Sequence, residues 1–324
     1  AAQAHSDALT HHIATVIEEA GGWIGFDRFM ALALYTPGLG YYSGGAHKFG
    51  AAGDFVTAPE ISPVFGATLA TQAAQIMRLS APHILEVGAG SGRLAADLLH
   101  ELARRDALPE QYAILELSGE LRERQRDTLA QTVPHLLARV LWLDRLPKRY
   151  DGLVLANEVL DAMPVQLVRW ADPAIHERGV GWQNGVFVWR DRPATARLLD
   201  YAQTLAHAFA LTGDYLGEVG FVAADWTAAW GRILGRGTLL LIDYGFPRRE
   251  YYHAQRDSGT LMCHYRHHSH TDPFFLPGLQ DITTHVDFTA IVEAGFDAGL
   301  TLLGYAPQGT FLLNCGIAQE MEKR

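Results

Sequence analysis

Residues 84–92 combine three glycines with an acidic residue inside an apolar run. They read Ile-Leu-Glu-Val-Gly-Ala-Gly-Ser-Gly. The apolar residues are typical of a short buried strand in a parallel sheet, and helical spacing follows over residues 93–99. A strand, a glycine-rich turn and a helix, in this order, open the nucleotide-binding α/β folds. The sequence therefore predicts a nucleotide or nucleotide-like cofactor at this turn.

The spacing of the glycines indicates which cofactor. A dinucleotide-binding turn, G-x-G-x-x-G, needs glycine at position 93, where this chain has Arg93. Instead Glu86, Gly88, Gly90 and Gly92 form E-x-G-x-G-x-G, the pattern of methyltransferases that use S-adenosyl-L-methionine (SAM) and release S-adenosyl-L-homocysteine. Glycines let the backbone approach the cofactor, and the Glu86 carboxylate suits its cationic amino-acid end. Another nucleotide, or a turn without ligand, is the alternative.

Two further acidic residues follow predicted strands. Glu116 lies in the strand predicted over 112–117, and Asp144 comes directly after the strand predicted over 140–143. In a doubly wound sheet, ligands lie at the carboxyl ends of the strands. We therefore expect Glu116 to accept the ribose hydroxyls of SAM and Asp144 to contact the adenine. The alternative at each position is a helix-capping or surface acid.

Residues 156–164, after the fourth predicted strand, are expected to act on the methyl acceptor. They read Ala-Asn-Glu-Val-Leu-Asp-Ala-Met-Pro, which is not the N/D-P-P-Y/F motif of DNA amino methylases. The segment supplies Asn157, Glu158 and Asp161, and carboxylates at this spacing can meet on one face of a turn. Two carboxylates can bind a guanidinium by charge-assisted hydrogen bonds and accept the proton lost on methyl transfer. The alternative is an acidic helix N-terminus favoured by the helix dipole.

The loop over residues 36–60 is a candidate lid. It is dense in Gly, Pro and aromatic residues, and long ordered loops of this kind are usually functional. We expect Asp54 and Thr57 to cover SAM, with Tyr41 and Tyr42 near the acceptor, because excluding water helps the transfer. The alternative is a structural loop packed by its own aromatic side chains.

Histidines gather in the C-terminal third. His285 and Asp287 precede the helix that follows an irregular segment, and we expect them to approach the same cleft; helix capping is the alternative. Residues 263–270 read Cys-His-Tyr-Arg-His-His-Ser-His. This spacing fits no compact zinc signature, so no metal is predicted.

The hydrophobic pattern predicts the elements that position these residues. Strands are expected over 84–87, 112–117, 140–143, 152–156, 238–242, 300–304 and 310–314. Helices are expected over 6–20, 26–35, 63–79, 91–105, 119–131, 194–210, 223–235 and 286–294. Asn184-Gly185 predicts the turn of a β-hairpin over 175–190, and residues 246–284 read as irregular.

Together these elements predict an α/β fold with a seven-stranded core, because a tightly joined terminal strand pair is typical of SAM-dependent methyltransferases. An N-terminal helical cap and lid loop would span residues 1–80. The core would span 81–171 and 236–324, with the irregular insertion 246–284 in its second half. An inserted α+β region would span 172–235.

Composition narrows the range of partners. The chain has 324 residues and a formal net charge of −10, which disfavours a nucleic-acid backbone and favours a cationic partner such as an arginine-bearing protein surface. The two cysteines, Cys263 and Cys315, form no disulfide framework. Because no apolar run is long enough to span a membrane and no charged-then-apolar leader is seen, we expect a cytoplasmic protein without membrane insertion. The oligomeric state is left open.

Six segments together resemble one family, the bacterial and mitochondrial SAM-dependent methyltransferases related to the arginine methyltransferase that assists mitochondrial complex I assembly. The strings P-E-I-S and N-E-x-x-D-A-x-P are specific, whereas the glycine motif is generic. The matching segments are 34–42, 53–62, 86–92, 156–165, 241–245 and 281–288.

The resemblance implies a Rossmann-like methyltransferase core with an added helical and hairpin region. For the mitochondrial member it implies symmetric dimethylation of an arginine on a complex I subunit. We therefore predict a SAM-dependent methyltransferase that modifies a protein nitrogen, with arginine as the expected acceptor. The alternatives are an assembly factor that binds SAM without turnover and a small-molecule methyltransferase.

Overall fold

The computed structural model describes residues 2–44, 58–171, 173–211 and 213–323, which form two compact units. The first, called here the antiparallel unit, comprises Ala1–Ala46, Leu160–Thr227 and Tyr244–Ala294. The second, called the parallel-sheet unit, comprises His47–Val159, Ala228–Asp243 and Gly295–Arg324. Each unit is assembled from segments far apart in the sequence. The division expected at residues 80, 171 and 235 stays a prediction.

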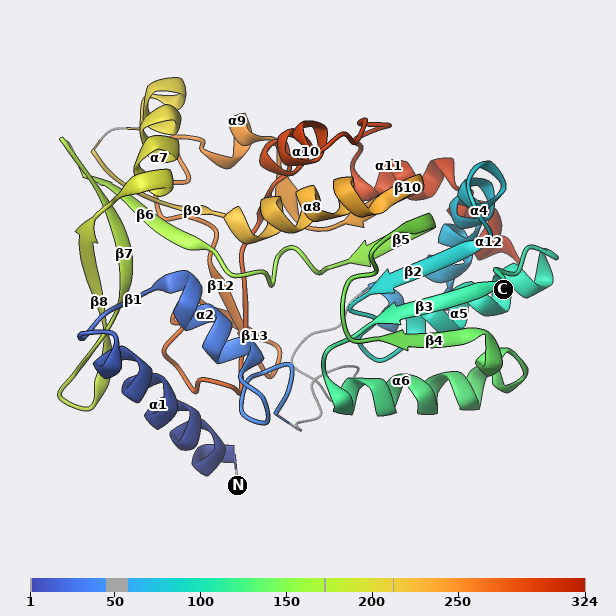
Figure 1. The fold of residues 1–324 in the computed structure, drawn as a ribbon, viewed down its shortest axis with the longest axis horizontal. Coiled ribbons are helices and arrows are strands. Elements are labelled where there is room, and N and C mark those ends of the chain that lie inside the picture. The colour runs from blue at the N-terminus through green and yellow to red at the C-terminus, as the bar shows by residue number, and fades with distance from the viewer. Residues whose placement is uncertain (1, 45–57, 172, 212, 324) are drawn as a thin grey trace. The chain divides into compact units, whose positions relative to one another are not determined.

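Five parallel strands form the centre of the parallel-sheet unit, in the order β10-β5-β2-β3-β4 (Figure 1). Their bounds are Leu234–Ile242 (β10), Tyr150–Asn157 (β5), His83–Val87 (β2), Gln111–Leu115 (β3) and Val140–Leu143 (β4). The central strands are apolar and buried, as expected of a parallel sheet covered on both faces. Val87 is level with Leu115 on one side and with Ala156 on the other. The segments that follow these strands therefore leave from the same edge of the sheet.

Helices of this unit begin at local sequence signals. The long helix α4 (Pro63–Leu79) starts with Pro63 after Ser62, whose hydroxyl accepts the backbone N–H of Val64 at 3.2 Å. In the same way the Ser118 hydroxyl caps α6 (Gly119–Thr132). The remaining helical segments are α3 (Ala58–Ile61), α5 (Arg93–Arg104), a 3₁₀ turn (Pro134–Arg139), α11 (Gln308–Asn314) and α12 (Ile317–Glu322). Two helices, α8 (Phe221–Ile233) and α10 (Phe288–Asp297), carry the chain from the antiparallel unit into this one.

The two terminal strands predicted from the sequence are wrong. Residues 300–307 form no strand, and the segment predicted as the last strand is helical in α11. Pro307 stands directly before α11, and short apolar runs do not distinguish a strand from a helix by periodicity. Leu303 is 78% exposed and so has no sheet against which to pack. Within the described residues the parallel sheet therefore has five strands rather than seven.

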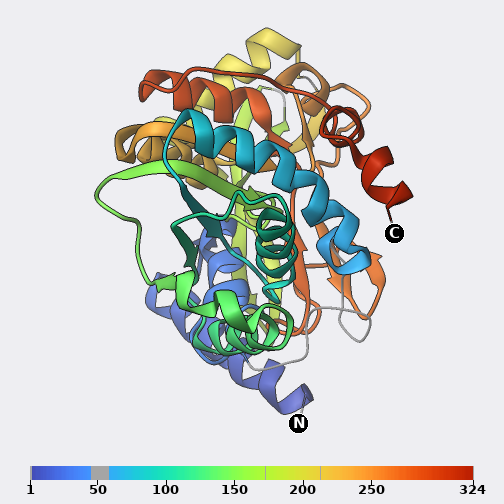
Figure 2. The same cartoon turned by 90° about the vertical axis from the view of Figure 1, so that its right-hand side faces the viewer.

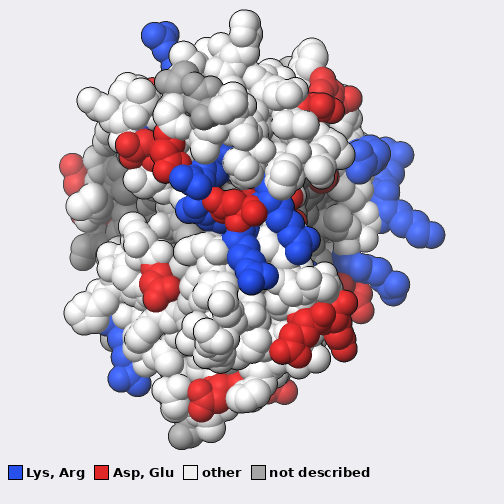
Figure 3. Space-filling model, turned by 90° about the vertical axis from the view of Figure 1, so that its left-hand side faces the viewer, with Lys and Arg blue, Asp and Glu red and all other residues white. Residues whose placement is uncertain are grey.

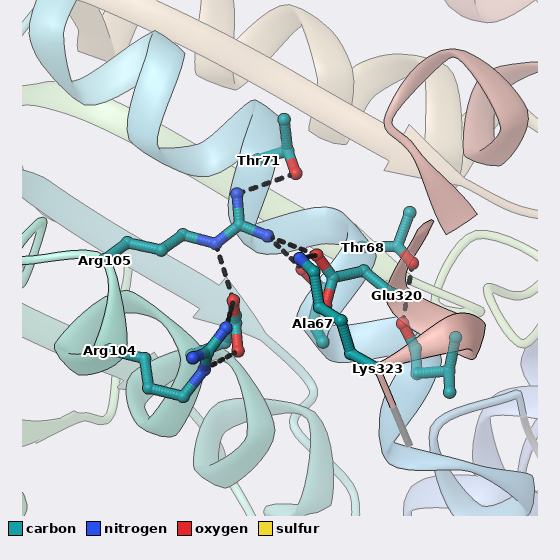
Figure 4. A network of polar contacts seen from close by, with 9 residues as sticks. Ala67, Thr68, Thr71, Arg104, Arg105, Glu320 and Lys323 are labelled. Carbon is teal, nitrogen blue, oxygen red and sulfur yellow. Dashed lines mark hydrogen bonds and ion pairs between the residues drawn. The ribbon is translucent and has the colours of Figure 1, made fainter. Parts of the chain in front are cut away.

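Arg105, which follows α5, connects the C-terminal helix α12 to α5 by ion pairs and to α4 by hydrogen bonds (Figure 4). Arg105 donates to Glu320 at 2.9 Å, to Thr71 at 3.0 Å and to Glu101 at 2.8 Å. Lys323 also binds Glu320 at 2.6 Å. Figure 2 shows α4 in light blue, with the dark red C-terminal segment that contains α12 beside it. Because Glu320 and Glu101 are buried, the Arg105 guanidinium compensates two charges that would otherwise be costly.

The antiparallel unit contains a sheet in the order β1-β7-β6-β9, with β8 beside β7. The strands are Ile24–Gly25 (β1), Gln166–Ala171 (β6), Ala174–Gln183 (β7), Val186–Pro193 (β8) and Asp214–Val219 (β9). The predicted hairpin turn at Asn184-Gly185 is confirmed, since both residues have a positive φ. Helices α1 (Ala2–Glu19), α2 (Phe26–Tyr35) and α7 (Ala196–Phe209) belong to the same unit.

The segment predicted as irregular contains regular structure. Its strands β12 (Met262–Tyr265), β13 (His268–His270) and β14 (Asp281–Thr283) form a small antiparallel sheet. It also contains α9 (Arg248–Tyr251), while β11 (Gly245–Phe246) pairs with β15 (Val286–Asp287). Cys263 is fully buried in this sheet, and residues 266–269 are exposed around its turn. The histidine-rich stretch is therefore a strand pair rather than irregular structure.

Arginines on the strands of the antiparallel unit are paired with carboxylates. Arg169 binds Asp191 at 3.2 Å and Asp214 at 2.5 Å, and Arg178 binds Asp191 at 2.8 Å. Figure 3 shows basic and acidic side chains intermingled on the side of the molecule where β7 and β8 lie. These arginines are therefore neutralised locally and do not form a uniformly basic surface. Among the described helices, none is long and apolar enough to cross a membrane.

Candidate functional site

The glycine loop between β2 and α5 has a backbone that other residues rarely adopt. Gly88, Gly90 and Gly92 have φ values of 63°, 52° and 83°, all in the left-handed region that favours glycine. A Cβ atom on Gly88 would lie 3.2 Å from a methyl of Val159, and one on Gly92 would lie 3.0 Å from the Cα of Gln125. Glycine is thus required here by the backbone conformation and by the close packing of the loop on Val159 and Gln125.

Three side chains from outside the loop hold it. The Ser91 hydroxyl donates to Glu60, which belongs to the P-E-I-S string, and Thr128 donates to the Ser91 carbonyl at 2.7 Å. Gln125 donates to the Gly90 carbonyl at 3.1 Å. The loop is therefore fixed both by the segment before α4 and by α6.

Glu86 lies inside the sheet. Its carboxylate is 2% exposed and accepts the Tyr112 hydroxyl at 2.6 Å. Burial raises the pKa of Glu86 to about 7; the Tyr112 hydrogen bond lowers it and the nearby Glu116 charge raises it. The sequence did not indicate Tyr112 as a partner, although its hydroxyl holds this carboxylate in place.

Glu116 follows β3 and is also buried. One carboxylate oxygen accepts the backbone N–H of Ser118 at 2.9 Å, and the other accepts the Gln125 amide at 3.0 Å. Burial raises the pKa of Glu116, while these hydrogen bonds and the charge of Arg122 oppose the rise. The side chain is thus held in one orientation at the carboxyl end of β3.

Asp144 differs from Glu116, because its side chain is 71% exposed and its ion pair is with the neighbouring Arg145 at 3.5 Å. The adjacent strand residue Trp142 donates its indole N–H to Gln125 at 3.0 Å, and its ring packs against the Arg126 guanidinium at 4.7 Å. The contact of Asp144 with adenine stays a prediction.

The end of β5 carries Asn157 and Glu158. Glu158 has a φ of 52°, which is uncommon for a residue with a side chain and is typical of functional sites. Its backbone N–H donates to the Ile242 carbonyl at 2.8 Å, and the next N–H, of Val159, donates to Asp243 at 3.1 Å. Asp243, directly after the neighbouring strand β10, therefore holds this turn.

Asn157 adds a buried polar atom at the same place. Its side-chain oxygen is buried and accepts no hydrogen bond within the described part of the chain. Its amide nitrogen lies 3.5 Å from a carboxylate oxygen of Glu158. A buried acceptor of this kind usually has a partner, which a bound ligand can supply.

Tyr41 and Tyr42 lie in the antiparallel unit, beside Asp281. The Tyr42 hydroxyl donates to both carboxylate oxygens of Asp281, at 2.9 and 3.1 Å, and its ring stacks on Tyr35 with centroids 5.5 Å apart. Burial is the main cause that raises the pKa of Tyr42, and the charges of Asp281 and then Asp161 add to it. Asp161 is itself buried, and its carbonyl accepts the backbone N–H of Thr284 at 2.9 Å.

His285 and Asp287 lie in the same unit, where His285 contacts an aromatic ring and Asp287 accepts hydrogen bonds. The His285 ring contacts Phe246 edge-on at 5.1 Å, and burial lowers its pKa, with Arg256 adding to the effect. Asp287 accepts Arg248 at 3.0 Å and also the backbone N–H groups of Thr289 and Ala290, at 3.0 and 3.2 Å. Asp287 thus caps α10, as in the capping alternative.

The predicted site residues are divided between the units. The parallel-sheet unit brings together the glycine loop, Glu86, Glu116, Asn157 and Glu158 at one edge of its sheet, with Asp144 in the same unit. Asp161 lies in the antiparallel unit, so its pairing with Glu158 stays a prediction. Asp54 and Thr57 lie outside the described residues. The sequence reasoning gave no role to Gln125, and Asp243 appeared only within a family string.

A protein-family model described as "Putative S-adenosyl-L-methionine-dependent methyltransferase" matches residues 68–306. The chain belongs to this methyltransferase family. The match covers most of the chain and confirms the family resemblance inferred from the six motifs. The protein is therefore a SAM-dependent methyltransferase.

The chain is also similar to a protein of solved structure. It is a likely methyl transferase from Burkholderia thailandensis bound to S-adenosyl-homocysteine, with 50% identity and a TM-score of 0.96; the similarity covers 100% of this chain and 84% of that one. The likeness confirms the α/β methyltransferase fold and the predicted cofactor.

Curated relatives with known names include "Protein arginine methyltransferase NDUFAF7, mitochondrial" of Danio rerio and Mus musculus. The Danio rerio protein is 27% identical, over 97% of this chain and 78% of its own length. The Mus musculus protein is 30% identical, over 95% of this chain and 74% of its own length.

Proposed function

We propose that this methyltransferase modifies a nitrogen of an arginine side chain on a protein. The observation that carries the proposal is its similarity, over nearly its full length, to proteins named as protein arginine methyltransferases. The formal net charge of −10 agrees with a cationic acceptor.

The cofactor is assigned to the carboxyl edge of the parallel sheet. Gly88, Gly90 and Gly92 would bring the backbone to SAM, Glu86 would face its cationic amino-acid end, and Glu116 would accept the ribose hydroxyls. Support for Glu116 comes from its fixed orientation, since the Ser118 N–H and the Gln125 amide each bind one of its oxygens. Asp144, Asp54 and Thr57 are assigned to the adenine and the lid from sequence alone.

SAM supplies a methyl group bound to a positively charged sulfur. Glu158 and Asp161 would hold the acceptor guanidinium by charge-assisted hydrogen bonds and direct one nitrogen toward that methyl group. That nitrogen would gain the methyl carbon as the bond from this carbon to sulfur breaks, which leaves S-adenosyl-L-homocysteine, and it would lose a proton to one of the two carboxylates. Support for Glu158 comes from its strained backbone and its anchoring by Ile242 and Asp243 at the end of β5. Asn157, Tyr41, Tyr42, His285 and Asp287 are proposed to line the acceptor side.

The test compares peptides that differ in one residue. The protein would be incubated with SAM and peptides that carry arginine, or lysine at the same position, and methylation would be read by mass spectrometry. We expect methylation of arginine peptides, its loss in Glu158→Gln, and unchanged binding of S-adenosylhomocysteine by that variant. Glu123→Gln, on an exposed position of α6, is the matched control.

Three results would contradict the proposal. Methylation of lysine peptides alone would show that lysine, and not arginine, is the acceptor. Methylation of small molecules only would favour a small-molecule enzyme. Binding of S-adenosylhomocysteine without any transfer would favour an assembly factor.

A further inference from the structure

Gln125 connects the ends of three neighbouring strands through one buried carboxamide. Its side chain is 0% exposed. The amide nitrogen donates to the carbonyl of Gly90, after β2, at 3.1 Å and to the carboxylate of Glu116, after β3, at 3.0 Å. The amide oxygen accepts the indole N–H of Trp142, in β4, at 3.0 Å. Ligands of parallel α/β sheets bind at this edge.

The three contacts require a carboxamide of this length. Both N–H groups point at acceptors, and the oxygen faces a donor that has no acceptor function of its own. The reversed amide would place its oxygen against a carbonyl and a carboxylate and its nitrogen against the indole N–H, so the network fixes the orientation. An ionised glutamate could make neither donation, because its carboxylate only accepts hydrogen bonds. A methionine could make none of the three contacts.

The backbone of the same residue also touches the glycine loop. A Cβ atom on Gly92 would lie 3.0 Å from the Cα of Gln125, so α6 passes directly against the loop here. One turn later Thr128 binds the Ser91 carbonyl at 2.7 Å. Thr128 holds only the loop, whereas Gln125 holds both the loop and the Glu116 carboxylate.

We propose that Gln125 is a positioning residue for the cofactor, through its hydrogen bonds to Gly90 and Glu116. The inference rests on the proposed role of Glu116 in ribose binding. With the Ser118 N–H on one oxygen and Gln125 on the other, the Glu116 carboxylate is held before any ligand arrives. Gln125 thus sets the distance between the loop and the ribose acceptor without being a catalytic residue itself.

Binding of S-adenosylhomocysteine by calorimetry tests this role. Gln125→Met fills the same space but leaves two acceptors and one donor without a partner. We expect it to weaken binding about tenfold or more. Gln131→Met is the matched control, since Gln131 lies on the same helix and is exposed, and it should bind like the wild type. A second comparison uses Glu116→Ala: the loss caused by Gln125→Met should shrink in that background, because the two residues act together.

The pH dependence of S-adenosylhomocysteine affinity distinguishes a positioning role of Gln125 from a role that only fills space. Gln125→Glu has nearly the same shape, but its ionised carboxyl would face Glu116, with Glu86 also nearby and Arg122 on the Glu116 carbonyl. Relative to wild type, its affinity should be reduced above neutral pH and should recover on acidification, as a proton shared by the two carboxyls restores a donor.

The possible outcomes distinguish the two proposals. No binding by the wild-type protein would overturn the cofactor site itself. Wild-type binding together with full affinity in Gln125→Met and a flat pH profile in Gln125→Glu would overturn only the role of Gln125. The role of Gln125 would also be overturned if the losses of binding free energy in Gln125→Met and Glu116→Ala were additive in the double variant. If Gln125→Met does not fold, Gln125→Glu alone decides the matter.

Discussion

Replacing Glu86 by glutamine tests whether the buried charge of this carboxylate lowers the free energy of unfolding. Burial raises the pKa of Glu86 from 4.5 to about 7. The folded protein therefore binds this proton more tightly than the unfolded chain, so stability falls as the pH rises from about 4.5 to about 7. The difference of about 2.5 pH units corresponds to about 3 kcal/mol above neutral pH.

Glutamine removes the charge and keeps an oxygen for the Tyr112 hydroxyl, which now lies 2.6 Å from the carboxylate. We expect Glu86→Gln to be more stable than the wild type by about 1–3 kcal/mol at about pH 8, and equal to it at about pH 4.5. Because Glu86 is assigned to the cationic end of SAM, the same variant should bind SAM more weakly at the higher pH.

Urea denaturation without SAM, followed by fluorescence across this pH range, measures the effect. Glu123→Gln changes the same functional group on an exposed position and should shift stability by no more than about 0.5 kcal/mol at any pH. A difference between Glu86→Gln and wild type that does not vary with pH would show that Glu86 does not titrate in this range. A variant less stable than wild type at about pH 8 would show that the charge stabilises the fold. Either result refutes the reasoning.

Three further predictions concern other parts of the molecule. Gly92→Ala should lose most SAM affinity and about 1–3 kcal/mol of stability, because φ is 83° and the new methyl would meet Gln125; calorimetry and thermal unfolding would show this, and wild-type behaviour would contradict it. Arg105→Met should cost about 3 kcal/mol by leaving the buried Glu320 and Glu101 carboxylates short of a partner, measured by urea unfolding; a loss below about 0.5 kcal/mol would contradict the tether. Glu218→Met should destabilise by about 2 kcal/mol, since the buried carboxylate accepts two backbone N–H groups and two hydroxyls, and methionine leaves these donors without an acceptor; an unchanged unfolding midpoint would contradict this.

Local signals in the sequence determined the boundaries of several elements. The helices predicted over 26–35 and 63–79 have these bounds in the structure, because Thr36-Pro37-Gly38 ends the first and Ser62-Pro63 starts the second. The five parallel strands and the hairpin turn were also predicted from apolar runs and from Asn184-Gly185. The glycine spacing identified the cofactor class, since it depends on backbone conformation within a few residues.

Strand pairings between distant segments could not be predicted from such local signals. Strands β6 and β9 pair across more than forty positions, and neither was predicted. The apolar run at 300–304 suggested a strand, yet no partner strand lies beside it among the described residues. Whether such a run becomes a strand depends on a neighbour elsewhere in the chain, which its own pattern does not specify.

The helix α6 shows, within one element, the difference between what local sequence predicts and what long-range contacts decide. Its sequence, Gly-Glu-Leu-Arg-Glu-Arg-Gln-Arg-Asp-Thr-Leu-Ala-Gln-Thr, predicted a helix and nothing more. Gln125 and Gln131 are the same residue type on this helix, and no local feature separates them. The tertiary structure buries Gln125 against Gly92 and gives it three partners, whereas Gln131 faces solvent. Residue types and spacing thus determined the cofactor class and the parallel strands, but only the packing of α6 on the sheet decided which polar side chain binds the glycine loop and Glu116, because burial and hydrogen bonding depend on contacts between residues far apart in the chain.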